Sequence, residues 1–292
     1  NVTEGNAMSA PKAHLGKQLF FDKRLSSNGE MSCQTCHQHA LGWSNGKPHS
    51  VKANGKQNTR NSPTMYNVGY QPHYYWDGRA PTMEANIMAA WKGHMGGDPD
   101  GMAKTLGGIK GYAEQFKSAF GGEPTGERIV NALATFVRTL RSGGSDYDLK
   151  KMSEKAQAGY AAYQKRCAAC HFENGLFTDF QFHNVGIGMD QENPDVGRNK
   201  HDKNAAVGSF KTPTLRSVTK SGPYFHDGSV ADLRKAVAIM ANGGLANEHL
   251  DSILSRLRAE HGEPSEEEID NLVEFLKALE SNETFEQPTL PQ

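Results

Sequence analysis

The chain contains the pentapeptide Cys33-Gln34-Thr35-Cys36-His37, and the same Cys-x-x-Cys-His spacing returns at Cys167-Ala168-Ala169-Cys170-His171. Together the two motifs use all four cysteines of the chain. In this spacing two thiols can add to the vinyl groups of one haem while the adjoining imidazole turns back onto the iron. The sequence therefore predicts two covalent c-type haems, with His37 and His171 as their proximal ligands.

A zinc site or a redox dithiol is the other interpretation of a Cys-x-x-Cys pair. A zinc pair would form a closed set of four Cys and His ligands, and a dithiol motif has no reason to place histidine directly after its second cysteine. The full pentapeptide occurs twice, and no cysteine is left over. These features favour haem.

Length and composition bear on how the chain is divided. The two motif histidines lie 134 positions apart in a chain of 292 residues, which is long enough for two domains of ordinary size. The apolar fraction is only 36%, and a large flat haem in each domain would supply missing core material. The small residues Ser142-Gly143-Gly144-Ser145 are typical of a linker. We therefore expect an N-terminal haem domain at 1–148 and a C-terminal haem domain at 149–292.

The hydrophobic pattern is helical, with long glycine-rich connections and no comparable series of alternating strands. Ser265 followed by Glu268 is a capping box, which predicts the start of the last helix. The pattern predicts a mainly α fold of two c-type cytochrome-like domains, each wrapped around one covalent haem. The five predicted helical segments are Leu15 to Leu25, Ile129 to Leu140, Ala156 to Cys167, Leu233 to Met240 and Ile269 to Leu279.

The net charge of −1 conceals an asymmetry. Residues 246–292 hold twelve acidic side chains against three basic ones, whereas residues 1–60 hold eight basic against three acidic. A solvated acidic helix explains the first excess, and a docking patch for an electron-transfer partner is the alternative. Nothing in this balance points to nucleic acid.

The compartment follows from the haem chemistry. No stretch has the continuous apolar length needed to cross a bilayer, so we expect no membrane span. Covalent haem attachment normally takes place outside the cytoplasm, and the amino end lacks a basic-then-apolar signal pattern. We therefore expect Asn1 to be a mature terminus whose export signal has been removed, and the periplasm to be the compartment.

Several ordered motifs extend beyond the two pentapeptides. On them the chain resembles the bacterial dihaem cytochrome c peroxidase family, which also includes the MauG-type enzymes that oxidise other proteins. The resemblance runs from about Leu15 to Leu279. The motifs are Leu19-Phe20-Phe21-Asp22, Arg60-Asn61-Ser62-Pro63-Thr64, Trp76-Asp77-Gly78-Arg79, Lys211-Thr212-Pro213-Thr214-Leu215-Arg216 and Pro223-Tyr224-Phe225-His226-Asp227-Gly228.

The resemblance implies the sixth ligand of the second haem. In this family it lies fourteen residues after the histidine of the Tyr-Phe-His-Asp-Gly motif, as methionine in the peroxidases and tyrosine in MauG-type enzymes. Counting from His226 reaches Met240. A helical methionine is more often core filler, but this register favours a ligand. A thioether favours ferrous iron, so the second haem is expected to be the high-potential haem that receives electrons from a donor.

Two further roles are implied by the resemblance. Trp76 matches the tryptophan that lies between the two haems, where core packing and electron relay are compatible. Asn61, Ser221 and Pro223 align with the family's calcium position at the domain interface. Oxygen ligands suit calcium, and two of the three would act through backbone carbonyls.

The chain departs from the family pattern at the first haem, which should be the peroxide site. Asn86 stands where the usual peroxidases have glutamine, and His94 falls where they have the glutamate that shuttles protons. A neutral imidazole can take a proton from one peroxide oxygen and return it to the other, so His94 is the candidate acid/base. Two alternatives stay open, in which His94 binds the iron directly or is an exposed loop residue beside Gly96 and Gly97.

Some family members close the oxidised first haem with a loop histidine. Counting back from Arg60 places that position at Ala53, which cannot bind iron, and His49 lies nearby but out of register. Unless His49 or His94 substitutes, the first haem should be five-coordinate and ready for peroxide. Arg79 and Arg198 are candidates to meet haem propionates.

These observations lead to one expected function and two alternatives. The first is a periplasmic dihaem peroxidase that reduces hydrogen peroxide with electrons from a small cytochrome or copper protein, with His94, Trp76 and Asn86 at the catalytic site. The second is a MauG-type oxidase that modifies tryptophan or tyrosine of a partner protein; Ala53 supports it and Met240 counts against it. The third is a non-catalytic electron-transfer or sensor cytochrome. Family members often form dimers, so a homodimer is also expected.

Overall fold

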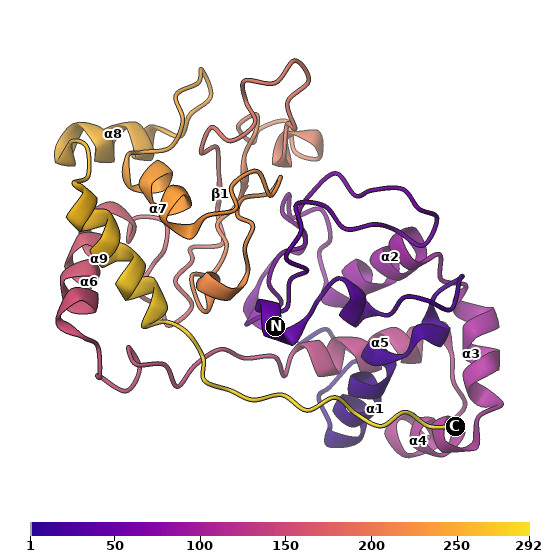
Figure 1. The fold of residues 1–292 in the computed structure, drawn as a ribbon. Helices are drawn as coiled ribbons and strands as arrows, with labels where there is room; N and C mark the ends of the chain where they lie inside the picture. Colours follow the sequence, from indigo (N-terminus) through magenta and orange to yellow (C-terminus); the bar gives the residue numbers. More distant parts are fainter. Residues whose placement is uncertain (1) are drawn as a thin grey trace.

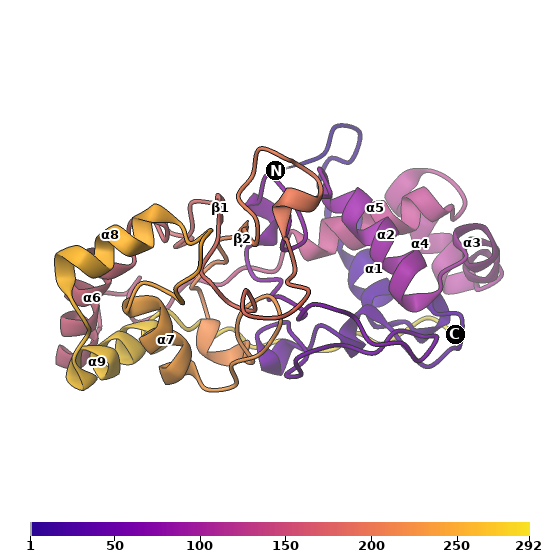
Figure 2. The same ribbon diagram turned by 90° about the horizontal axis from the view of Figure 1, so that it is seen from above.

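A computed structural model describes residues 2–292, so the predicted mature terminus at Asn1 lies outside the described residues. The described chain is mainly helical, as predicted, with one small antiparallel pair of strands. Figures 1 and 2 show two groups of helices side by side, α1 to α5 in one half and α6 to α9 in the other. The elements are α1 Ala10–Phe21, α2 Met83–Met95, α3 Pro99–Gly107, α4 Lys110–Phe120, α5 Gly126–Val137, α6 Glu154–Arg166, α7 Leu233–Ala241, α8 Ser252–His261, α9 Glu266–Lys277, β1 Phe182–His183 and β2 Phe210–Lys211.

Each half is centred on a close helix pair. Helix α1 crosses α5 at Gly16, where a Cβ atom would lie 1.9 Å from the carbonyl oxygen of Ala132. Helix α6 crosses α9 in the same way at Gly159, where a Cβ atom would lie 1.8 Å from the carbonyl oxygen of Asn271. Glycine at both crossings lets the two backbones meet, and apolar clusters form around them.

The two halves are copies of one another over a long segment. Tyr74 pairs with Ala80 in an isolated antiparallel bridge, and 150 residues later Tyr224 pairs with Val230 in the same way. The hydroxyl of Thr64 donates to the carbonyl of Gly42 at 2.6 Å, and Thr214, again 150 residues later, donates to a backbone carbonyl at the same distance. The left-handed backbone conformation also recurs at this interval, at Asn67 and Ser217, Tyr75 and Phe225, and Gly78 and Gly228.

The copies meet through a reciprocal pair of backbone hydrogen bonds. The N–H of Asn61 donates to the carbonyl of His226 at 2.7 Å. The N–H of Lys211 donates to the carbonyl of Trp76 at 2.8 Å. Lys211 is the counterpart of Asn61 and His226 that of Trp76 at the 150-residue interval, so the junction has approximate two-fold symmetry.

The carboxyl-terminal tail leaves the second half and returns to the first. It follows α9 and runs along the molecule to end near α4 (Figure 1). Phe285 stacks on Phe21 with ring centroids 5.6 Å apart and meets Trp43 edge-on at 4.9 Å. Arg24 and Gln18 donate to backbone carbonyls of the tail at 2.9 and 3.1 Å. The predicted division at residue 148 did not anticipate this return.

The predicted linker is held in place by hydrogen bonds. Ser142 Oγ lies 2.8 Å from Ser217 Oγ, and the buried Ser145 donates through its N–H to Asp148 at 3.0 Å. Asp148 in turn pairs with Arg216 at 2.7 Å. The connection between α5 and α6 is therefore ordered by contacts with the second half.

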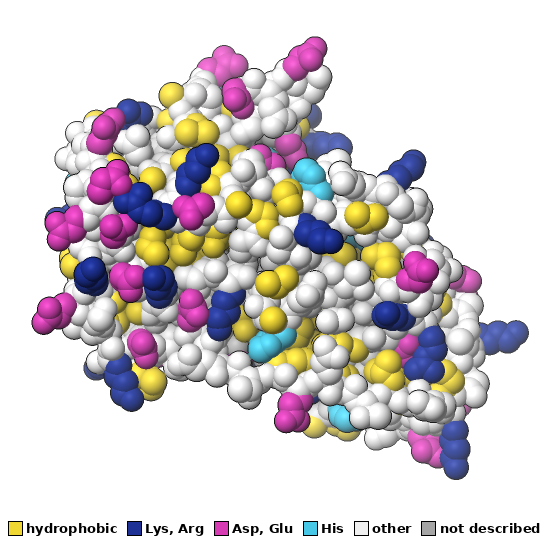
Figure 3. Space-filling model, in the orientation of Figure 1, with side chains coloured by type: hydrophobic (Ala, Val, Ile, Leu, Met, Phe, Trp, Pro, Cys, Tyr) yellow, Lys and Arg dark blue, Asp and Glu magenta, His cyan; other side chains and the backbone are white. Residues whose placement is uncertain are grey.

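The acidic excess near the carboxyl end does not form a patch of one sign in the view of Figure 3, where magenta and dark blue side chains alternate over the second half. Arg234 pairs with Asp270 at 2.6 Å, and Lys277 pairs with Glu274 at 2.7 Å. This arrangement favours a solvated acidic helix. None of the helices within residues 2–292 has the length and apolar character that a bilayer crossing requires.

Candidate active site at the junction of the two halves

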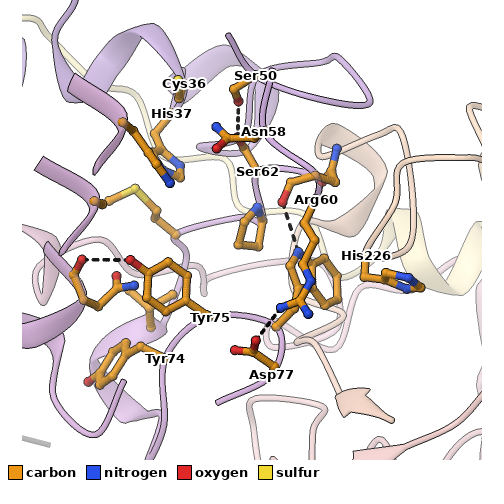
Figure 4. A pocket seen from close by; sticks show the side chains of 18 of the residues that line it. Cys36, His37, Ser50, Asn58, Arg60, Ser62, Tyr74, Tyr75, Asp77 and His226 are labelled. Carbon is orange, nitrogen blue, oxygen red and sulfur yellow. Dashed lines mark hydrogen bonds and ion pairs between the residues drawn. The ribbon is translucent and has the colours of Figure 1, made fainter. Parts of the chain in front are cut away.

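A cavity of about 900 Å³ opens beside the first pentapeptide and reaches the second half (Figure 4). Its volume is in the range of cofactor sites in proteins. Its walls bring together Cys33, Cys36 and His37, one face of α2, and residues of the second half such as Lys211 and His226. The α2 residues in the wall are Met83, Asn86, Ile87, Ala90, Trp91, His94 and Met95.

Both proximal histidines are oriented by a carbonyl six residues later in the chain. His37 Nδ1 lies 2.9 Å from the Trp43 carbonyl oxygen, and His171 Nδ1 lies 2.9 Å from that of Phe177. Because a carbonyl only accepts, each Nδ1 carries the proton and each Nε2 is left with a lone pair for iron. Burial lowers the pKa of both imidazoles, which also keeps them neutral. The residues therefore fit two c-type haems.

Trp43 and Phe177 were not identified from the sequence. Each is buried and adopts a left-handed backbone, with φ of 59° and 55°. Each sits among aromatic rings that hold its carbonyl toward the histidine. The sequence did contain a signal for these two residues, because an aromatic residue stands six positions after each motif histidine.

Among the described residues the cysteines do not belong to a closed set of four zinc ligands. Burial raises the pKa of Cys33 and of Cys167 to about 12, so each thiol is neutral before haem attaches. In the described chain the one cluster with metal-ligand geometry is Cys170, Asp179 and His183. The cysteine of this cluster belongs to the second pentapeptide. Burial lowers the pKa of His183, but Asp179 and the other acidic partners outweigh burial and raise this pKa to about 11.

His94 lies in the last turn of α2, half-buried in the same cavity wall as His37. Burial, with Lys52 and His37 adding to it, lowers the pKa of His94 to about 4. The carbonyl of His94 accepts the N–H of Ala53 at 2.8 Å, so the loop position expected from the family lies against this helix end. His49 also lines the cavity, and its buried Nε2 has no hydrogen-bond partner among the described residues.

Trp76 and Asn86 lie in the same wall. The indole Nε1 of Trp76 donates to the Asn61 carbonyl at 3.0 Å, which fixes the ring at the junction of the two halves. The side chain of Asn86 lines the cavity, and its carbonyl accepts from Tyr75 at 3.3 Å. The structure thus brings all three predicted catalytic residues to one cavity.

Of the remaining predicted ligands, Asn61 also lines this cavity, whereas Met240, Ser221 and Pro223 do not. Met240 is half-buried in the last turn of α7, next to Ala241, which shares an apolar cluster with Cys167 of the second pentapeptide. Asn61 donates through its side chain to the Lys47 carbonyl at 3.0 Å. Ser221 donates to the Val218 carbonyl at 3.1 Å. The calcium role of Asn61, Ser221 and Pro223 stays a prediction.

A charged network lines the cavity at the junction, and the sequence assigned no role to its members Asp77, Arg60 and Asp195. The side chain of Asp77 is 2% exposed and pairs with Arg60 at 2.6 Å and Arg79 at 2.9 Å. Arg60 also pairs with Asp195 of the second half at 2.6 Å (Figure 4 shows its contact with Asp77). Although burial opposes its ionisation, these guanidinium groups lower the pKa of Asp77. Arg198 donates to the Gly78 carbonyl at 3.0 Å. Arg79 and Arg198, the two arginines predicted to meet haem propionates, therefore both make contacts at this junction.

Lys211 is a further buried charge at the junction. Its Nζ donates to the His73 carbonyl at 2.6 Å and to Gln71, and the side chain lines the cavity. Burial lowers the pKa of Lys211 to about 7. The lysine therefore ties the two halves together beside Trp76.

Comparison with known proteins agrees with this geometry. The family model described as di-haem cytochrome c peroxidase matches residues 10–157. The methylamine utilization protein MauG of Methylorubrum extorquens is 35% identical over 99% of this chain and 83% of its own length. The cytochrome c551 peroxidase of Nitrosomonas europaea is 32% identical over 97% of this chain and 84% of its own length.

Solved structures share the whole architecture. A MauG-like protein associated with microbial copper homeostasis has a TM-score of 0.86 and 26% identity, over 97% of this chain and 93% of its own. The dihaem peroxidase BthA of Burkholderia thailandensis has the same fold, with a TM-score of 0.77 and 20% identity over 94% of this chain and 87% of its own. The chain therefore belongs to the di-haem cytochrome c peroxidase family and is a haem-dependent oxidoreductase that acts on peroxide.

Proposed function

We propose that this protein is a periplasmic peroxidase that reduces hydrogen peroxide to water with electrons from a small cytochrome or copper protein. The observation that carries the proposal is that His37 and His94 line one cavity of about 900 Å³, together with Asn86. Reduction of one peroxide consumes two electrons and two protons and yields two waters. The side chains at the cavity therefore have to transfer protons between the peroxide oxygens and donate hydrogen bonds to them.

His94 is the proposed proton carrier. Its lowered pKa leaves the imidazole neutral near pH 7, so it can accept a proton from one peroxide oxygen and return it to the other. Asn86 offers an amide that can donate a hydrogen bond to peroxide. The apolar side chains of Met83 and Ile87 line the same wall and limit the water beside the reacting oxygens.

The haem held by Cys33, Cys36 and His37 would supply the redox-active iron for this chemistry. The proposed electron entry lies in the second half, where His171 and Met240 would hold the other haem. Trp76 would shorten the path between them, because its ring is fixed at the junction by Asn61. Calcium at Asn61, Ser221 and Pro223, and a homodimer, complete the proposal.

A MauG-type oxidase is the second candidate. The observation in its favour is Ala53, which lies against His94 where a closing histidine would otherwise stand. The relatives that match almost the whole chain include MauG proteins as well as peroxidases. Met240 in the position of the MauG tyrosine favours the peroxidase.

One turnover experiment separates the candidates. Holoprotein with two haems per chain would be mixed with peroxide and an excess of reduced small cytochrome. The peroxidase proposal expects many turnovers and two cytochromes oxidised per peroxide. Slow turnover, with a new covalent modification on a partner protein, would instead support the oxidase. Absence of any reaction with peroxide would contradict both.

A further inference from the structure

The helices that follow the two Asp-Gly turns are equivalent in the duplicated fold. Helix α2 begins after Thr82, whose side chain caps it, and α7 begins after Asp232, whose side chain caps it in the same way. The two caps are 150 residues apart, the interval that relates the preceding bridges and turns. Positions in α2 and α7 can therefore be compared one by one.

The comparison pairs Met240 with Ala90. Each is the eighth residue of its helix. The face of α7 that carries Met240 also carries Leu233 and Val237, which pack into the cluster that contains Cys167. The matching face of α2 lines the cavity that contains His37, and Ala90 is part of that wall.

We propose that Ala90 is the residue that keeps the first iron site open, because it places a methyl group where the duplicated scaffold places the Met240 thioether in the second half. The proposal rests on the proposed function, in which Met240 is a ligand. A methyl group cannot bind iron, and its small volume leaves room for a small oxidant opposite His37. The difference in iron ligation between the two halves would thus reside in one pair of equivalent positions.

The same register assigns a place to His94. It follows Ala90 by four residues, one helical turn or about 6 Å farther along the same face of α2. His94 therefore lies beside the ligand position and not at it. This placement suits a group that exchanges protons with a bound peroxide, and it argues against the alternative in which His94 is the iron ligand.

Ala90→Met tests the proposal on the oxidised holoprotein, with azide as the probe and optical and electron paramagnetic resonance spectra as the readout. The expected result is a low-spin first haem with methionine ligation and a loss of azide affinity of at least about tenfold. The control is Ala89→Met, which adds the same side chain at the exposed neighbouring position and should leave both readings unchanged. Haem content verifies that each variant is assembled.

Ala90→Leu is the second variant, because it adds similar volume without a ligand atom. It should weaken azide binding without producing the methionine signature. Wild-type azide affinity in both Ala90 variants, with two haems bound, would overturn the inference and leave the peroxidase proposal intact. A wild-type protein that is low-spin at both haems and binds no azide would contradict the proposed function itself.

Discussion

His94 lines the cavity that contains His37, and burial lowers its pKa, so its imidazole is neutral near pH 7. Replacing it with alanine removes the imidazole from the cavity wall without touching His37 or either cysteine. We expect the reaction with peroxide to slow by about 10²- to 10⁴-fold, the range of general acid/base groups, while haem content is unchanged. Stopped-flow absorbance at stoichiometric peroxide measures this rate. His49→Ala is the matched control in the same cavity, and an unchanged rate in His94→Ala would remove His94 from the mechanism.

The lowered pKa of His94 predicts a pH dependence. Its pKa is about 4 in the folded protein against 6.5 ordinarily, with burial as the main cause. The imidazole therefore stays able to accept a proton down to about pH 4, and we expect the peroxide rate to be level from pH 7 to 5 and to fall below about pH 4. In the unfolded chain this imidazole takes up its proton near pH 6.5. Acidification from pH 6.5 to 4 therefore favours the unfolded state and lowers the free energy of unfolding. His94→Gln should abolish this step in the rate profile.

The sequence predicted several of the side chains that line the cavity beside the first pentapeptide. Cys33, Cys36 and His37 follow from motif geometry, and His94 lines the same cavity as His37, while its role in proton transfer stays a prediction. Trp43 could not be found in this way, because its contribution is a backbone carbonyl aimed by a left-handed φ. The pair of Arg60 and Asp195 spans 135 residues, so only the folded chain shows that they meet.

At the level of elements, the glycine crossings are the most constrained points. Gly16→Ala would drive a methyl group into the Ala132 carbonyl, so we expect the free energy of unfolding to fall by about 1–3 kcal/mol. Gly93→Ala in α2 is the matched control, because no atom lies within 4 Å of its added methyl group. There alanine should stabilise the protein by about 0.5–1 kcal/mol through helix propensity. Denaturant unfolding of both holoproteins measures the difference, and equal effects would contradict the close crossing.

Among the described helices, α1, α5, α6, α7 and α9 were predicted from apolar spacing, whereas α2, α3, α4 and α8 were not. α5 begins three residues before its predicted start, at a cap formed by Thr125, whereas α9 begins after the Ser265 cap that the sequence predicted. α1 ends at Phe21 and not at Leu25, because the Asp22 carboxylate caps a separate short turn by accepting the Arg24 N–H at 2.9 Å. α2 was not predicted, because the polar side chains of Asn86 and His94 interrupt the apolar face that lines the cavity.

At the scale of the whole molecule, the tail links the second half to the first haem site. Phe285 packs on Trp43, and the Trp43 carbonyl orients His37. Phe285→Ala should therefore lower the stability of the first half by about 1–2 kcal/mol and leave the second half unchanged. Thermal unfolding followed separately at the two haem signals measures this. Glu286→Ala, at the exposed neighbouring position, is the control, and an equal loss in both halves would contradict a local role.

Two halves of similar design were expected from the repeated pentapeptide, but the degree of duplication was not. The intervening loops differ in length, so the interval between equivalent residues changes from 134 at the pentapeptides to 150 at Asn61 and Lys211 and beyond. The polar tail gave no sign that it would cross to the other half, since Phe285 is its one aromatic side chain.

The returning tail also has a consequence for the order of assembly. A ribosome makes the chain from its amino end, so the half that contains Cys33 is synthesised first. The ring that packs on Trp43 belongs to Phe285, which follows Cys33 by 252 residues and is therefore synthesised much later. The first half therefore lacks the contact between Phe285 and Trp43 until the tail has been synthesised and has packed against it.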